Sequence, residues 1–255
     1  DPQPEDIYWE TPYSSYGQQD YTFDKAKQAS DFRQRQYEIC AQGTGGAYRQ
    51  PDYGPCFTVA DSSYLVEPIP GLWLLAVDAN VYVPREDADL TNPQSAKNFA
   101  GSGDAGYNKM LTHKQQVVAW MTSVAMRAKE QKKTLITFSH FPMVEFDNGA
   151  AGDLESIFGE GKFQLKRAPK EDTSHALAKT GIGVHVGGHM HFNDTGVRKY
   201  PDGSLLFNIQ APSMAAYVPA YKILNFSNRS EIDVQTVILD SVPRFNELFE
   251  HYQQE

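Results

Sequence analysis

Short apolar runs separated by turn residues recur along the chain from residue 56 onward, and they predict strands. A run bounded by Gly, Pro, Asn or Asp is typical of a strand, and a continuous apolar run indicates a strand covered on both faces. The stretches "GLWLLAVDAN" (71–80) and "TLITFSHFP" (134–142) are of the continuous kind. The strands predicted before residue 194 are 56–61, 63–69, 71–80, 134–142 and 182–186.

Helical spacing occurs in three earlier segments. The clearest helix is predicted from Leu111 to about Lys132, with Thr112 and Gln115 at the spacing of a capping box. Its apolar face comprises Val117, Val118, Met121, Val124, Ala125 and Ala128. A short helix over 173–181 is expected to start at Thr173 or Ser174, and weaker periodicity predicts a helix within 23–41.

Beyond Asp194 the pattern changes to strands joined by short turns. Segments 195–200, 203–211, 221–227 and 231–239 predict antiparallel hairpins, and a last helix is expected over 242–255. Strands and helices first alternate and then give way to hairpins, which predicts an α/β fold: a mixed two-sheet sandwich flanked by helices. We expect a single domain over 1–255, with an irregular connecting region over 1–55 and the core over 56–255.

Composition narrows the classes of partner. The formal net charge of −9, without a dense Lys/Arg run, disfavours nucleic-acid binding by charge. No stretch reaches the roughly 18 consecutive apolar residues of a membrane span, so no membrane association is expected. A small-molecule substrate fits this composition better.

Two cysteines, Cys40 and Cys56, flank a segment rich in Gly, Tyr and Pro that lets the chain double back. They form a disulfide if the protein is exported, and otherwise remain two thiols; the spacing leaves both readings open. An exported or periplasmic location is therefore a hypothesis.

Three histidines form the candidate site. His140 follows a buried strand, and the carboxyl ends of such strands commonly carry ligand-binding groups. His189 and His191 follow another strand after two glycines, and their spacing directs both imidazoles to one side of an extended segment. We interpret the three as metal ligands. The remaining histidines are expected to be structural: His113 and His251 at the surface or as caps, His185 packed in its strand, and His175 on a short helix.

The stretch "LITFSHFP", preceded by the long helix, and the later "GVHVGGHMHFND", followed by the hairpin strands, together resemble the C-terminal half of calcineurin-like metallophosphoesterases, from about residue 56 onward. The resemblance implies a binuclear site of two divalent or trivalent ions (Mn, Fe, Zn or Ni). His140 and His189 would bind the second metal, and His191 the first. Such a site hydrolyses phosphomonoesters or phosphodiesters by polarising the phosphoryl group for in-line attack. Asn193 and Tyr217 are candidate substrate contacts.

The chain departs from the family pattern at its opening motifs. The sequence contains no D-x-H and no G-N-H, and "GDLES" ends in the wrong residue for G-D-x-x-D. We therefore expect this chain to be the C-terminal part of a metallophosphoesterase, with the missing N-terminal part as its partner. Asp1 would then be the acidic residue that follows G-N-H in the family motif. Without a bridging carboxylate, three imidazoles cannot hold two cations together, so the isolated chain is expected to bind one ion or none and to be nearly inactive. The alternatives are a mononuclear zinc hydrolase and a non-catalytic binding protein of the same fold.

Overall fold

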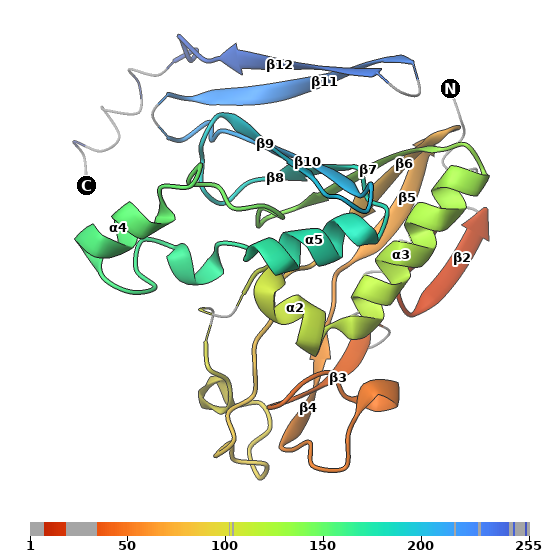
Figure 1. Ribbon diagram of the computed structural model, residues 1–255, viewed down its shortest axis with the longest axis vertical. Coiled ribbons are helices and arrows are strands. Elements are labelled where there is room, and N and C mark those ends of the chain that lie inside the picture. The colour runs from red at the N-terminus through yellow and green to blue at the C-terminus, as the bar shows by residue number, and fades with distance from the viewer. Residues whose placement is uncertain are drawn as a thin grey trace.

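Six of the predicted strands lie in an eight-stranded mixed sheet together with two strands that were not predicted, β1 and β2, as seen in the computed structural model in Figure 1. The structure describes residues 8–18, 35–101, 103, 105–216, 218–228, 231–244, 247 and 253. The strand order is β2-β1-β5-β6-β7-β8-β10-β9, with parallel pairing from β6 through β7 and β8 to β10. The strands are β1 (Tyr8–Thr11), β2 (Ser14–Gln18), β5 (Tyr64–Ile69), β6 (Leu72–Ala76), β7 (Thr134–Ser139), β8 (Val184–Gly187), β9 (Asp194–Lys199) and β10 (Leu205–Gln210).

Helices cover one side of this sheet, and a separate hairpin lies across the other. Helices α2 (Tyr107–His113), α3 (Gln115–Glu130) and α5 (Glu171–Lys179) lie on the covered side, whereas α4 (Ala151–Phe158) lies at the periphery (Figure 1). The hairpin of β11 (Ala220–Asn228) and β12 (Glu231–Ile238) forms its own antiparallel sheet above β9 and β10 (Figure 1). This layering confirms the predicted mixed α/β fold class. No helix among the described residues is long and apolar enough to cross a membrane.

The helix predicted from Leu111 to Lys132 is two helices that meet at Lys114. The Lys114 side chain is fully buried; its ammonium donates to the Asp78 carbonyl at 2.6 Å and lies 3.1 Å from the Asp61 carboxylate. A buried ammonium must be paired, and Lys114 reaches its partners at the position where α2 ends and α3 has not yet begun. The predicted capping box is wrong: the Gln115 N–H donates instead to the Thr44 hydroxyl at 3.0 Å, across 71 positions of sequence.

The N-terminal region, predicted as irregular, contains regular structure. Strand β1 pairs with both β2 and β5. Most of the helix predicted within 23–41 lies outside the described residues, but its end, Gln36–Cys40, is strand β3, so the prediction is wrong there. Pairing with β4 (Cys56–Ala60) overrides the weak helical pattern. Most of the predicted helix over 242–255 also lies outside the described residues.

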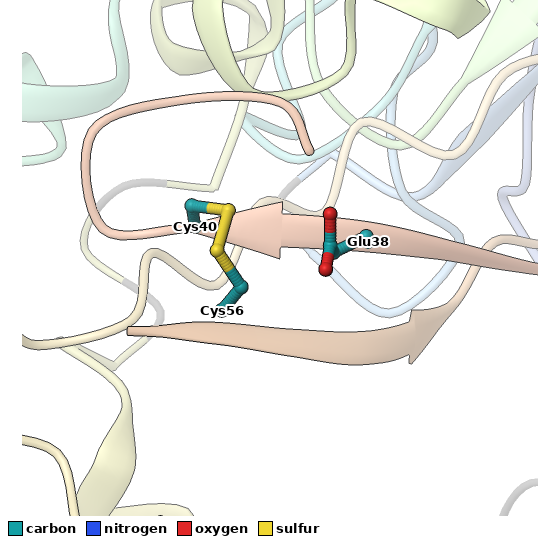
Figure 2. A group of neighbouring side chains, drawn as sticks. All are labelled: Glu38, Cys40 and Cys56. Carbon is teal, nitrogen blue, oxygen red and sulfur yellow. A yellow bond between two sulfur atoms is a disulfide. The ribbon is translucent and has the colours of Figure 1, made fainter. Parts of the chain in front are cut away.

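The cysteines settle one open alternative, because Cys40 and Cys56 form a disulfide between strands β3 and β4. Figure 2 shows the bonded sulfur atoms beside the carboxylate of Glu38. Ligand atoms of these three residues lie within 4.8 Å of one another. Metal binding by cysteine requires free thiolates, so a disulfide with an adjacent carboxylate is not a metal site. It closes the connection over 41–55, at the end of the strand pair where β3 leads into β4.

Candidate metal centre

Two of the three predicted ligands meet at the carboxyl ends of neighbouring strands. His140 follows β7 directly, and His189 lies two residues beyond β8, which pairs with β7 in parallel. Nδ1 of His189 and Nε2 of His140 are 2.9 Å apart. Phe141 packs against both imidazoles, with ring centroids 4.8 and 4.7 Å away. Because β7 and β8 are neighbours in the sheet, histidines that are distant in sequence lie with two ring nitrogens facing each other.

The segment that carries His189 and His191 is not an extended strand, which corrects the prediction from H-x-H spacing. Both residues adopt left-handed backbone conformations, with φ of 65° and 59°. Such conformations are uncommon for residues other than glycine and cluster at functional sites. Backbone contacts hold the segment: the Gly188 N–H donates to the His140 carbonyl at 3.0 Å, and the Gln210 amide donates to the Gly188 carbonyl. The H-x-H spacing therefore does not direct both imidazoles to one side, as it would in an extended strand.

Glycine at position 187 permits the close approach of the two histidine segments. A Cβ atom there would lie 3.2 Å from the backbone Cα of Pro142, which is tighter than ordinary contact. Glycine has no Cβ and so permits this approach of one backbone segment to another. Any side chain at this position would push the His140 segment away from the His189 segment.

Gln164 fixes the tautomer of His189, a role that no pattern in the sequence indicated. The Arg167 guanidinium donates to Oε1 of Gln164 at 3.2 Å, so the atom that faces His189 is the amide oxygen. An oxygen only accepts, and therefore Nε2 of His189, 3.1 Å away, must carry the ring proton. Nδ1 of a neutral His189 then holds its lone pair toward His140. This is the arrangement in which one ring nitrogen is anchored and the other is free to bind a metal.

Both imidazoles are held in the neutral form. Burial, together with the charges of His140, Arg167 and His191, lowers the pKa of His189 to about 4. Burial, His191 and Arg167 also lower the pKa of His140. Neutral imidazole is the form that binds a metal. Because Nδ1 of His189 carries the lone pair, Nε2 of His140 donates the hydrogen bond between them, and its proton would move to the other ring nitrogen when an ion binds.

The facing nitrogen atoms have a separation suited to a shared metal ion. Two imidazole nitrogens bound to one ion at about 2.0–2.1 Å lie about 2.9 Å apart at a right angle and about 3.3 Å apart at a tetrahedral angle. The observed distance of 2.9 Å lies at the lower end of this range. The donor set of His140 and His189 therefore fits a metal with little movement, and His191 is a third candidate ligand.

A buried polar network fixes the segment on which His140 lies. Ser139 accepts a hydrogen bond from Tyr107 at 2.9 Å and lies 2.8 Å from Nε2 of His185. Asn208 Oδ1 lies 2.7 Å from Nδ1 of His185 and accepts from the Met143 N–H at 2.9 Å. Because Asn208 Oδ1 only accepts, His185 is protonated at Nδ1, and its Nε2 faces the Ser139 hydroxyl, which also donates to the Phe141 carbonyl at 2.8 Å.

The network is structural, since His185 is completely buried and burial lowers its pKa to about 4. The prediction that His185 packs within its strand is confirmed. The alignment of Ser139, His185 and Asn208 has the spacing of a hydrolytic triad, but its histidine and asparagine are closed to solvent. The network anchors residues 139 and 143 on either side of His140.

His191 does not join the pair: among the described residues, His140, His189 and His191 form no group whose ligand atoms all lie within 4.8 Å of one another, and no carboxylate completes such a group with them. Asp78 follows β6, which pairs with β7, and so it lies at the same edge of the sheet as His140. Its carboxylate is already bound by Ser62 and Asn80. Burial opposes ionisation of Asp78, but the Lys114 charge and these hydrogen bonds hold its pKa below the ordinary value.

The candidate substrate contacts and the histidines expected to be structural lie as follows. Asn193 lies next to the site, where its Oδ1 accepts from Lys222 at 2.6 Å, and Tyr217 lies outside the described residues. His113 was expected at the surface or as a cap; it is the last residue of α2 and is only 3% exposed, so a surface position is wrong. His175 stacks on Tyr200 and contacts Asp202 at 2.8 Å, away from the metal centre.

Comparison with protein-family models and with curated proteins finds no match for this chain. Among solved structures, the chain is similar to a dimetal phosphatase from Danio rerio at 14% sequence identity, with a TM-score of 0.38. The similarity covers 70% of this chain, which spans about 60% of that structure.

Proposed function

We propose that this protein is a metal-dependent phosphoric-ester hydrolase in which His140, His189 and His191 are metal ligands. The observation that carries the proposal is the 2.9 Å approach of two neutral imidazole nitrogens, one of which is held in its tautomer by Gln164. A metal-ligating histidine almost always donates its other ring N–H to an outer partner, as His189 does to Gln164.

The residues of this chain would have distinct roles. His140 and His189 would hold one ion together, and His191 would approach from the adjacent turn. When bound, the metal supplies Lewis-acid polarisation of a phosphoryl oxygen and activation of water. Arg167, whose charge acts on both imidazoles, would attract the anionic phosphoryl group to a protein whose net charge is −9.

A binuclear centre needs a carboxylate that bridges two ions. We propose that such ligands and the first metal come from outside the described residues, that the described histidines hold one ion, and that this chain alone hydrolyses esters slowly. The runner-up is a mononuclear zinc hydrolase that uses the same three histidines. High activity with a single ion per chain would favour it.

Isothermal titration of the metal-free chain with Zn²⁺ tests the proposal. We expect one ion per chain, and we expect His140→Ala and His189→Ala each to lose more than the roughly 10–100-fold in affinity that removal of an outer partner costs. His175→Ala is the matched control, because this histidine lies in a separate cluster with Tyr200 and Asp202. If all three variants bind Zn²⁺ as the wild type does, the assignment fails.

A further inference from the structure

A cavity of about 300 Å³ is lined by His191, and neither His140 nor His189 is among its lining residues. Its wall combines residues 191–193 with Pro212, Val218 and Ala220 and with residues of strand β12. Its lining residues are His191, Phe192, Asn193, Pro212, Val218, Ala220, Thr236 and Ile238. The proposed metal ligand therefore forms part of the cavity wall.

The cavity has an apolar wall and one polar end. Phe192, Val218 and Ile238 are 42%, 46% and 60% exposed, although large apolar side chains gathered around one hollow are normally covered. At the polar end, the Lys222 ammonium donates to Asn193 at 2.6 Å and to Thr236 at 3.0 Å. Asn193 was a candidate substrate contact, and here it forms part of a fixed polar corner rather than pointing freely into solvent.

We propose that this cavity binds the organic group of the ester and selects a leaving group that is apolar and about the size of one substituted aromatic ring. The inference rests on the proposed function, because it takes His191 to mark the position of the phosphoryl group. A benzene molecule fills an apolar protein cavity of about 150 Å³, so the present volume accommodates one ring with substituents. Apolar walls disfavour a sugar or a second phosphate, whose polar groups would lose water without gaining partners.

The test compares phenylphosphonate with methylphosphonate, two stable phosphoryl compounds that differ in the organic group, on the full chain with Zn²⁺. We expect phenylphosphonate to bind at least about tenfold more tightly, because the ring buries apolar surface that a methyl group lacks. Val218→Asp and Ile238→Asp should abolish this preference and leave Zn²⁺ binding unchanged. Ile223→Asp is the matched control: Ile223 is exposed on strand β11 but does not line the cavity.

Binding of phenol without metal separates the two proposals. In one outcome Zn²⁺ does not bind, whereas phenol binds the wild type and does not bind Val218→Asp. The cavity is then a ligand site, and the metal assignment fails. If Zn²⁺ binds and the two phosphonates bind equally to every variant, the leaving-group inference is overturned while the metal proposal stands. A wild-type dimer that Val218→Asp dissociates in sedimentation velocity would assign the cavity to a second copy, which also overturns it.

Discussion

Replacing Asn208 by alanine tests whether the buried network positions the metal ligand His140. Asn208 lies on β10, is 2% exposed, and accepts from Met143 N–H and from His185 through a single amide oxygen. The substitution leaves two buried donors without an acceptor. Each such group costs about 1–3 kcal/mol, so we expect a loss of about 4 kcal/mol in the free energy of unfolding. For a chain of this size the melting temperature should fall by about 10 °C.

The same substitution should weaken metal binding, although Asn208 touches no predicted ligand. Ser139 and Met143, on either side of His140, are both anchored through this network. We expect Zn²⁺ affinity to fall about 10–100-fold, the usual effect of losing a residue that orients a ligand. Urea denaturation followed by tryptophan fluorescence gives the stability, and calorimetric titration of folded protein gives the affinity.

Leu206→Ala is the control for destabilisation alone. Leu206 is completely buried on the same strand and has an apolar side chain, so its truncation should cost about 2–5 kcal/mol without removing a hydrogen bond. We expect its Zn²⁺ affinity to stay within about twofold of the wild type, a difference of about 0.4 kcal/mol. Equal losses of affinity in Asn208→Ala and Leu206→Ala would refute the positioning role. So would a loss of stability below about 1 kcal/mol in Asn208→Ala, because unsatisfied buried donors cost at least that much.

Three further predictions address the tautomer, the pH dependence and the disulfide. Gln164→Leu removes the acceptor that holds the proton on Nε2 of His189 and should lower Zn²⁺ affinity about 10–100-fold in calorimetry, whereas Gln131→Leu at the surface should not. Because burial lowers the pKa of His185 from 6.5 to about 4, the unfolded chain binds this proton more tightly; stability is fully present above pH 6.5 and should fall by about 3 kcal/mol toward pH 4. Denaturant unfolding at both pH values should show a shallower fall in His185→Gln, and parallel curves would contradict this account. Replacing both Cys40 and Cys56 by alanine should lower the free energy of unfolding by about 3 kcal/mol, since the bond closes a short loop in the unfolded chain. An unchanged midpoint in urea would show that the bond does not constrain the unfolded state.

Local pattern was enough to predict most elements that carry the candidate site. The apolar runs at 71–80 and 134–142 contain strands β6 and β7, and the run at 182–186 overlaps β8, because a strand covered on both faces needs apolar residues throughout. Helix α5 was also predicted, but its suggested cap was wrong. Ser174 is buried and donates to the Met143 carbonyl instead of capping the helix. A cap depends on which backbone groups tertiary packing leaves open, and the sequence does not contain that information locally.

By itself, the sequence determined the residue types at the candidate site and their position after buried strands. Tertiary structure alone decided which ring nitrogen of His189 faces His140, because the deciding contact comes from Gln164, 25 positions away. It also decided that His189 and His191 adopt left-handed backbone conformations, that Thr44 caps α3, and that His185 and Asn208 support the strand of His140. These features depend on contacts between segments distant in sequence, and such contacts exist only after the sheet has assembled. Periodicity reports on the environment of one element, whereas the direction of a hydrogen bond depends on the partner that another element supplies.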